Sequence, residues 1–456
     1  MRRAPVNGRG KGERPLGTIS RRVSPAVAAA LTSSRTRTLL RIVAEARRRL
    51  RGDPHRIVYF HQADDPYSHL AAQILDALGE RYDVVLEPAL VGPPSDTAAP
   101  ERERLEAFAR RDAADVAPGY GLSFPATARV PDRSAVRLAE RLLESAIAAG
   151  SFARFARRVG DALWSADASG LEALAKETGI ADETRTRSSI EEGNRRREQL
   201  GHYLGAMFHY GGEWYWGVDR LTHLERRLRA LGLARPGVPG APLVERPVFP
   251  DRPPASKQRF KLEFYVSLRS PYTAIVFDRV LALCDRLPVD LVLRPVLPMV
   301  MRGLPVPAAK RLYITLDTKR EAEDAGVAFG RVADPVGRPV ERAFSLWPFA
   351  RSKGRGAEWL REFLVASFAD GIDTGTDAGL RLVAERAGLE WDDALPHLDR
   401  EGWRDELEGN RERLLALGLW GVPSFHLLAG EGESAYSTWG QDRLWRVEAE
   451  IRSRIG

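Results

Sequence analysis

The sequence has a single cysteine, Cys284, among its 456 residues. An intrachain disulfide cannot form and no Cys-x-x-Cys motif exists, which excludes a dithiol–disulfide redox cycle within the chain. Because Cys284 lies on an apolar helical pattern, we interpret it as a small core residue rather than a nucleophile. No apolar run approaches the ~20 residues that span a bilayer. We therefore expect a cytoplasmic protein without a membrane partner, since nothing in the sequence requires an oxidising compartment.

Two other kinds of motif are missing. The eight histidines show no spacing typical of metal ligands, so we predict no metal site. Neither a Walker loop nor a GxGxxG fingerprint occurs, which argues against a nucleotide-binding enzyme of those two types.

Positive charge is concentrated at the N-terminus. Residues 1–52 carry 14 Lys and Arg against two acidic residues, whereas the net charge of the whole chain is only +7. Such a basic arm can touch nucleic acid, phospholipid or an acidic partner, or it can be a solvated, disordered extension. The first 50 residues contain no aromatic side chain, so we do not expect nucleic acid as a partner. Residues 25–50 could also form a basic amphipathic helix that packs on the body.

The remainder of the chain contains the same pattern twice. VYFHQADDPYSHL in the first copy corresponds to EFYVSLRSPYTAI in the second, and in both an apolar run and a short loop precede a Pro-Tyr pair. Pro66 and Pro271 lie 205 positions apart, and Asp219 and Asp442 lie 223 apart. The tetrapeptide Glu-Gly-Asn-Arg also occurs once in each copy, in the same order. This matched order predicts a tandem duplication of one domain.

The predicted organisation has four parts. Residues 1–54 form a basic tail, disordered or partly helical, and residues 55–233 form the first domain. A proline-rich segment at 234–258 is typical of a stiff linker, and residues 259–456 form the second domain. Each domain begins with a strand, a helix and a parallel strand, continues with a mainly helical stretch and closes with a hairpin and a helix. The expected opening elements are Ile57–Phe60, Pro66–Leu78 and Asp83–Leu90 in the first copy, and Leu262–Val266, Pro271–Asp285 and Val289–Pro295 in the second.

Ser270, Pro271 and Tyr272 open the first helix of the second copy. Serine suits the N-cap and proline suits the first helical position, so the segment can be a plain helix cap. The same geometry can also hold an anion, because free N–H groups and the positive end of the helix dipole lie beside the hydroxyl. A bound thiolate would then be favoured over the thiol.

Two further segments of the second copy permit both a structural and a functional interpretation. Val422 precedes Pro423, which can be cis and can present the backbone of Val422 to an extended ligand, or can simply form a turn before a strand. Asp442, after Gln441, can be an N-cap of the last helix, or can hold the ammonium of an amino-acid-like group.

Taken in order, these motifs resemble the kappa-class glutathione transferases and the 2-hydroxychromene-2-carboxylate isomerases of the DsbA-like thioredoxin superfamily. The resemblance covers nearly all of residues 260–456 and implies an α/β fold, namely two tandem DsbA-like thioredoxin domains, each with a helical insertion. The matching residues are Phe264-Tyr265, Ser270-Pro271-Tyr272-Thr273, Pro307 with Lys310 and Tyr313, Gly421-Val422-Pro423-Ser424, and Gly440-Gln441-Asp442-Arg443.

The resemblance implies a role for each of these positions. Ser270 would stabilise the thiolate of glutathione or of a related small thiol, and Val422 would pair with the cysteinyl backbone ahead of Pro423. Gln441 and Asp442 would hold the γ-glutamyl end. Lys310 would bind a glutathione carboxylate or an acidic substrate, or it is a solvated helix lysine.

Several positions depart from the family pattern. An Asn that helps to hold the ligand in the family is missing from the segment Met301–Pro305, and Thr273 replaces a serine. In the first copy Asp65 replaces the key serine and Ala206 aligns with Pro423. A carboxylate beside a thiolate would raise the thiol pKa, so we interpret the first copy as degenerate.

The sequence thus predicts a thiol-dependent isomerase or transferase that acts on a small aromatic or unsaturated acid, with the thiol as nucleophile. Because the family forms homodimers, the resemblance also implies a pseudo-dimer of the two copies within one chain. The alternative is a non-catalytic thioredoxin-fold scaffold whose two copies are binding modules.

Overall fold

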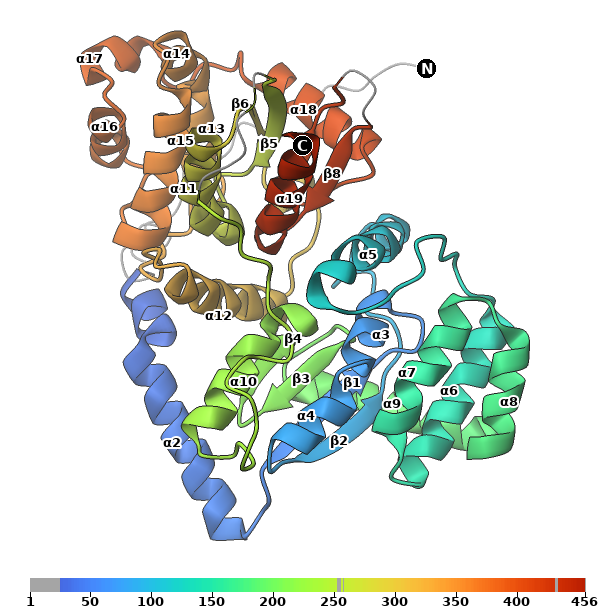
Figure 1. Cartoon of the computed structure of the whole chain (residues 1–456). Coiled ribbons are helices and arrows are strands. Elements are labelled where there is room, and N and C mark those ends of the chain that lie inside the picture. The colour runs from blue at the N-terminus through green and yellow to red at the C-terminus, as the bar shows by residue number, and fades with distance from the viewer. Residues whose placement is uncertain (1–24, 252–255, 257, 431–433, 456) are drawn as a thin grey trace, which may run out of the picture.

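The computed structural model describes residues 25–251, 256, 258–430 and 434–455. It contains two mixed four-stranded sheets, one in the first half (residues 55–233) and one in the second half (residues 259–456), each surrounded by helices (Figure 1). The strand orders are β2-β1-β3-β4 and β6-β5-β7-β8, so the second order repeats the first. Two such sheets are consistent with two domains.

The first half opens with a βαβ unit and inserts helices α5 to α9 before its closing hairpin. Its elements are β1 (Arg56–His61), α3 (Pro66–Ala72), α4 (Leu75–Arg81), β2 (Val85–Leu90), α5 (Arg102–Val116), η1 (Pro118–Tyr120), α6 (Arg133–Ala148), α7 (Phe152–Trp164), α8 (Ala168–Thr178), α9 (Glu183–Gln199), β3 (Met207–Tyr210), β4 (Glu213–Trp216), η2 (Val218–Arg220) and α10 (Leu221–Ala230).

The second half follows the same plan, with a longer helical insertion that includes one π-helical turn, η4. Its elements are β5 (Phe260–Val266), α11 (Pro271–Arg286), β6 (Val289–Pro295), η3 (Met299–Arg302), α12 (Ala308–Asp324), α13 (Arg338–Ser345), α14 (Trp347–Ser352), α15 (Gly356–Val365), η4 (Ala366–Asp370), α16 (Asp377–Arg386), α17 (Trp391–Ala394), η5 (Leu395–His397), α18 (Arg404–Ala416), β7 (Ser424–Leu427), β8 (Tyr436–Trp439), η6 (Gln441–Arg443) and α19 (Leu444–Ile455).

Strand pairing is the same in both sheets. The first strand pairs in parallel with the second, through β1–β2 and β5–β6, and pairs antiparallel with the third, which then forms the hairpin. The opening elements of the second half differ from their predicted bounds by at most two residues. The helix predicted at Pro66–Leu78 is instead divided into α3 and α4. The division falls at Gln73, whose side-chain amide bonds both the backbone N–H and the C=O of Ser123.

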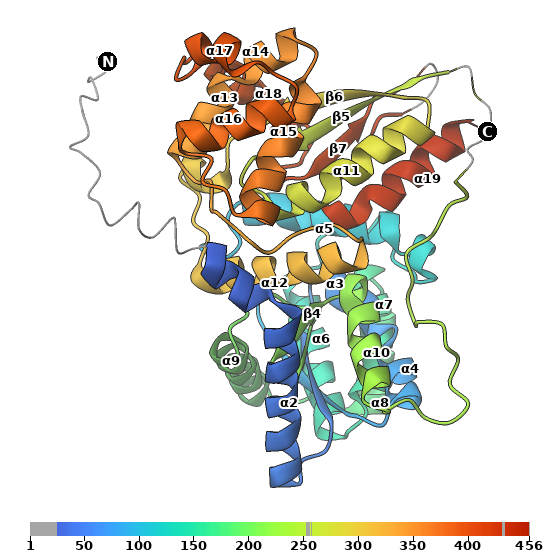
Figure 2. The ribbon, with the colours of Figure 1, turned by 90° about the vertical axis from the view of Figure 1, so that its left-hand side faces the viewer.

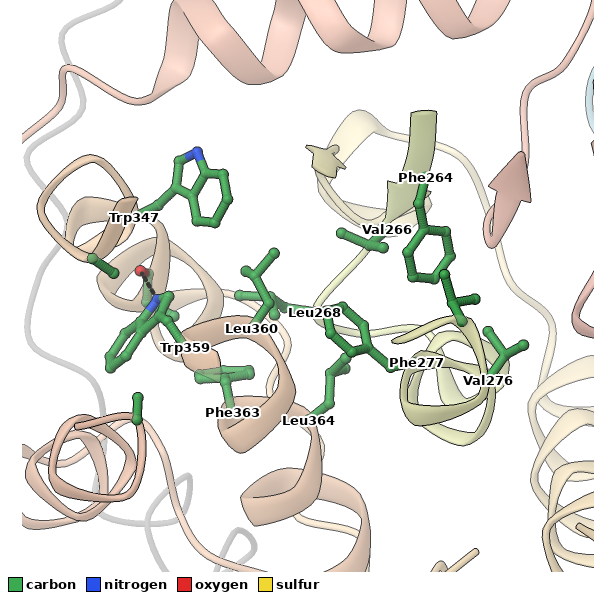
Figure 3. Packing of buried hydrophobic residues seen from close by; sticks show 14 of the residues in the cluster. Phe264, Val266, Leu268, Val276, Phe277, Trp347, Trp359, Leu360, Phe363 and Leu364 are labelled. Atoms are coloured by element: carbon green, nitrogen blue, oxygen red, sulfur yellow. Dashed lines mark hydrogen bonds between the residues drawn. The ribbon is translucent and has the colours of Figure 1, made fainter. Parts of the chain in front are cut away.

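Each half has its own apolar core, on the helix-covered face of its sheet. In the second half β5 and α11 pack against the inserted helices, as Figure 3 shows for Phe264, Phe277 and Leu360. The indole N–H of Trp359 in this core donates to the carbonyl of Ala343, so the buried polar atom is satisfied (Figure 3). Burial of large side chains of this kind stabilises a fold by about 1.5–3 kcal/mol each.

Two helices are exchanged between the halves. Phe108 of α5 packs on the second sheet, against Tyr265 and Trp439, within a separate apolar cluster. Tyr313 of α12 packs on the first sheet, against Phe60 and Met207. Figure 1 accordingly shows α12 over β3 and β4, and α5 beneath the second half. Each half therefore completes the outer face of the other sheet.

The tail and the linker are partly structured. Residues 25–32 are helical, and α2 (Ser34–Arg51) follows them along the edge of the molecule (Figures 1 and 2). The segment predicted as a linker packs along the first half, where Val244 is buried and Arg246 reaches the junction of the two halves. The predicted tail residues 1–24 and the prolines at 253 and 254 lie outside the described residues.

Candidate functional site

Ser270 lies at the N-cap of α11, as its sequence context predicts. Its hydroxyl accepts a hydrogen bond from the backbone N–H of Thr273 at 3.1 Å and lies 3.4 Å from the carbonyl oxygen of Val422. Ser270, Pro271 and Tyr272 are all partly exposed. The hydroxyl is thus at the positive end of a 16-residue helix and within reach of a ligand.

The loop before β7 supplies the second wall of this site. The Val422–Pro423 peptide bond is cis, and Val422 is partly exposed whereas Pro423 is buried. The carbonyl of Pro423 accepts from the N–H of Gly440 at 2.9 Å, which joins this loop to the segment before η6. Gly421 is required at its position, because a Cβ there would lie 2.2 Å from the ring of Trp439. The structure therefore brings Ser270 and Val422 together.

The corresponding place in the first half is closed by its own side chains. Asp65 caps α3 and accepts from the hydroxyl and the N–H of Ser68 at 2.8 and 2.9 Å. The Ser68 hydroxyl in turn accepts from the N–H of Ala206 at 2.9 Å. Burial raises the pKa of Asp65 to about 6, more than its hydrogen bonds with Ser68 lower it. The carboxylate of Asp65, linked to the loop at Ala206 through Ser68, thus lies in the position that Ser270 occupies in the second half.

Gln441 and Asp442 are not free to meet a ligand without rearrangement. Both are buried, and the Gln441 amide donates to Glu321 at 2.6 Å and accepts from Arg279 at 3.1 Å. Asp442 accepts from Arg220, a residue of the first half, at 2.8 Å. Burial alone would raise the pKa of Asp442, but Arg443, Arg220 and Arg246 outweigh it and lower this pKa to about 2.

The contact between Arg220 and Asp442 is one part of a crossed network, which we call the arginine cross. Arg220 also binds Asp317 of α12 through its Nε at 3.0 Å. Arg443 does the reverse, because it binds Asp112 of α5 at 2.9 Å and Asp219 of η2 at 2.8 Å, both in the first half. Each arginine therefore crosses to two carboxylates of the opposite half.

A tyrosine from each half completes this arrangement. Tyr67 donates to Asp112 at 2.8 Å, and Tyr272 donates to Asp317 at 2.7 Å. Tyr272 of the predicted site thus orients a carboxylate of the arginine cross through its hydroxyl. All four carboxylates of the arginine cross are buried. Charge-assisted hydrogen bonds are strong in such a place, and an unpaired charge is costly.

Lys310 contacts the first half. Its ammonium donates to the carbonyl of Ala98 at 2.9 Å and lies 5.8 Å from the ring centroid of Tyr203. Burial lowers its pKa to about 8. The interpretation of Lys310 as a solvated lysine is therefore wrong, because this side chain lies in the junction between the halves.

Other candidate features lie elsewhere. A cavity of about 180 Å³ at the junction is lined by Tyr120, Asp219, Arg246 and Glu321 among others, and Ser270 is not part of its lining. Burial raises the pKa of Cys284 to about 12, which suits a core residue rather than a nucleophile. Across the described ranges, no cluster of three or more His, Cys, Asp or Glu could hold a metal ion. No helix in the described part of the chain is both long and apolar enough to cross a membrane.

Sequence reasoning missed the arginine cross, although a signal for it was present. Tyr67 and Tyr272 differ by 205 positions, as do Asp112 and Asp317, and this is the offset of the two Pro-Tyr motifs. Arg220 and Arg443 share the offset of 223 that relates Asp219 to Asp442. A search for charged pairs at the repeat offsets would have found these residues, but not that they pair across the halves.

The comparisons with known proteins agree with this fold. Residues 261–452 match the model of the DSBA-like thioredoxin domain. No curated protein matches the chain.

Several solved structures are similar in fold. One is a 2-hydroxychromene-2-carboxylate isomerase, with 18% identity, a TM-score of 0.36, and coverage of 42% of this chain and 95% of the isomerase. Another is the cytosolic disulfide reductase DsbM from Pseudomonas aeruginosa, with 19% identity and a TM-score of 0.33. The match covers 43% of this chain and 100% of the reductase. The structure of the same reductase with GSH has 18% identity and a TM-score of 0.32, and the match covers 42% of this chain and 99% of the reductase. At these identities and scores the likenesses carry no argument about function. By its family match, residues 261–452 form a DsbA-like thioredoxin domain.

Proposed function

We propose that the second half binds glutathione or another small thiol at Ser270, and that the protein is an isomerase or transferase acting on an aromatic or unsaturated acid. The first half is, in this proposal, a degenerate tandem copy that acts as a structural partner in an intrachain pseudo-dimer. The boundaries are those predicted from the sequence, with domains at 55–233 and 259–456.

The observation that carries the proposal is the position of the Ser270 hydroxyl. It is partly exposed at the N-terminus of α11 and adjoins the backbone of Val422. A hydroxyl there can donate to a bound sulfur, and the helix dipole favours the charged form, so the pKa of the thiol would fall. A bound thiolate supplies the nucleophile for attack on an electrophilic carbon.

The other predicted contacts fit glutathione unequally. Val422 is accessible, which supports a backbone contact with the cysteinyl unit. Gln441 and Asp442 already have protein partners, so a γ-glutamyl ammonium would share Asp442 with Arg220 rather than meet an unpaired carboxylate. Lys310 retains a positive charge below about pH 8 and would hold a carboxylate beside Tyr203 of the first half.

The pseudo-dimer is supported by reciprocal contacts. α5 and α12 each cover the sheet of the opposite half, and Arg220 and Arg443 make matching crossed contacts. Interfaces in which residue i contacts residue j, and j contacts i, are typical of two-fold dimers. A duplicated domain fused in one chain would retain such an interface while one active site degenerates.

The test is calorimetric titration of glutathione into the wild type and three variants. We expect Ser270→Ala to raise the pKa of the bound thiol, measured by thiolate absorbance against pH, and to weaken binding above neutral pH. Asp442→Asn removes the charge but keeps the shape, and should weaken binding. Asp65→Asn, the matched change in the first half, should leave binding unchanged. Absence of binding by any small thiol would refute the proposal.

The alternative is a scaffold of two binding modules. It is favoured by one observation, namely that Gln441 and Asp442 serve the junction of the halves and are buried there. A scaffold has no requirement for a thiol and none for Ser270. If Ser270→Ala leaves every thiol measurement unchanged, the scaffold is the better account.

A further inference from the structure

The helix α2 has its two faces arranged opposite to those of an ordinary surface helix. None of its 18 residues is buried, although surface helices usually pack an apolar stripe on the core. Four of its apolar residues, Leu39, Ile42, Val43 and Leu50, follow helical spacing on one side and are 62%, 58%, 43% and 88% exposed, and Leu40 beside them is 64% exposed. We call these four residues the apolar stripe.

The polar face of α2 is held against the body. Arg37 pairs with Glu323 of α12 at 2.6 Å, and Arg41 pairs with both oxygens of Glu213 of β4 at 2.6 and 2.9 Å. Glu45 accepts from Tyr210 of β3. Because these residues lie at spacings of four, one continuous row fixes the helix and turns the apolar stripe outward.

Arginines border the apolar stripe. Arg35, Arg47 and Arg49 are exposed beside it, and the one acidic residue of α2, Glu45, is on the body-facing row. The exposed side of α2 is therefore apolar and basic. Figure 1 shows α2 along an outer edge of the molecule, and Figure 2 shows it in front of the neighbouring elements.

We propose that α2 docks the protein on an anionic lipid surface. Helices with an apolar face flanked by Lys and Arg lie in the plane of the membrane interface, where apolar burial and attraction to anionic headgroups act together. A membrane needs no spanning segment for this mode of binding, so this proposal departs from the expectation of no membrane partner. A second copy of the chain fits less well, because pairing two stripes would gather the arginines of both copies without an acidic partner.

The test is sedimentation of the full chain with vesicles of phosphatidylcholine alone and of phosphatidylcholine mixed with phosphatidylglycerol. We expect binding to the anionic vesicles only, with affinity that falls as salt rises. The variant Leu39→Ser/Ile42→Ser/Val43→Ser keeps every arginine and should bind at least about tenfold more weakly. Val130→Ser, a change at a 64% exposed residue outside α2, is the matched control and should bind as the wild type.

Three outcomes would overturn the proposal. One is no binding to anionic vesicles. Another is equal binding by the triple variant, which would leave only non-specific attraction of the basic N-terminus. The third is a dimer that forms without lipid, by analytical ultracentrifugation, and that the triple variant abolishes, because the stripe would then be covered by a second copy. Unfolding curves in urea verify that the triple variant is folded, since its three sites are exposed in the wild type.

Discussion

The N-termini of α3 and α11 occupy the same place in two similar sheets, yet Pro66 and Tyr67 are buried whereas Pro271 and Tyr272 are partly exposed. In the first half Ser68 bridges Asp65 and the N–H of Ala206, and Ala206 is buried. In the second half Pro423 has no N–H, and the hydroxyl of Thr273 has no hydrogen-bond partner among the described residues. Ser270 is partly exposed, and its hydroxyl reaches the loop directly, at the carbonyl of Val422 3.4 Å away.

This difference shows how two similar helix caps can differ in the charge that they tolerate. The exchange of serine for aspartate keeps the helix cap, because both residues accept from the N–H groups of the first turn. It reverses the electrostatics, since a carboxylate repels the anion that the helix terminus attracts. Asp65 and Ser270 therefore have the same structural role as helix caps, but only Ser270 is compatible with a bound anion.

The largest effect on stability is expected when one arginine of the arginine cross is removed. Arg443→Ala leaves Asp112 and Asp219 buried without an ion-pair partner among the described residues. Arg220→Ala removes the shortest ion pairs of Asp317 and Asp442, which then keep only Arg320 at 3.2 Å and Arg443 at 3.6 Å. We expect each variant to lose about 3–5 kcal/mol of unfolding free energy, measured by urea denaturation.

The exposed Arg381→Ala is the control for these variants, because its pair with Glu385 lies on the surface of α16 and should contribute little. Loss of stability in only one of the two arginine variants would contradict the reciprocity of the cross. Replacement of either arginine by lysine should also lower the stability, since lysine cannot reproduce the forked contacts of arginine.

The opening elements of both halves could be predicted from the sequence, whereas the contacts that join the halves could not. Alternating and helical periodicities locate β5, α11 and β6, and the Ser270-Pro271 pair identifies the start of α11. The exchange of α5 and α12 depends on long-range packing of Phe108 and Tyr313, which no local pattern encodes. For the same reason the sequence indicates that Asp442 is polar and near a helix, but not that Arg220 from the other half pairs with it.

Asp65 and Asp442 should have smaller effects on the free energy of unfolding, and these effects should depend on pH with opposite signs. The pKa of Asp65 is raised from 3.8 to about 6 in the fold, so the folded state holds the proton more tightly. Stability should therefore fall as pH rises from about 4 to about 6, and Asp65→Asn should gain about 3 kcal/mol at pH 7.

Asp442 should behave in the opposite way. Its pKa is lowered from 3.8 to about 2, so the stability that it adds is present above pH 3.8 and is lost as pH falls towards 2. Asp442→Asn should accordingly destabilise the protein at pH 7. Urea denaturation across this pH range tests both variants, and equal signs would contradict the assignment of the two environments.

The smallest expected effect concerns Lys310. If it binds a carboxylate of the thiol or of the substrate, Lys310→Met should weaken affinity about tenfold at pH 7, which is ~1.4 kcal/mol. Because its pKa is about 8, the wild-type affinity should fall above that pH while the affinity of the variant stays level. Lys319→Met on the same helix is the control, and a similar loss there would show a general effect of charge.

The most direct test of the difference between the halves is the number of glutathione molecules bound per chain, measured by calorimetry for the wild type and Ser270→Asp. This variant places in the second half the residue that the first half already has. We predict one molecule per wild-type chain and none per Ser270→Asp chain, with the variant shown to be folded by urea denaturation. Two molecules per wild-type chain, or one per variant chain, would contradict the claim that Ser270 is the difference between an open thiol site and a closed one.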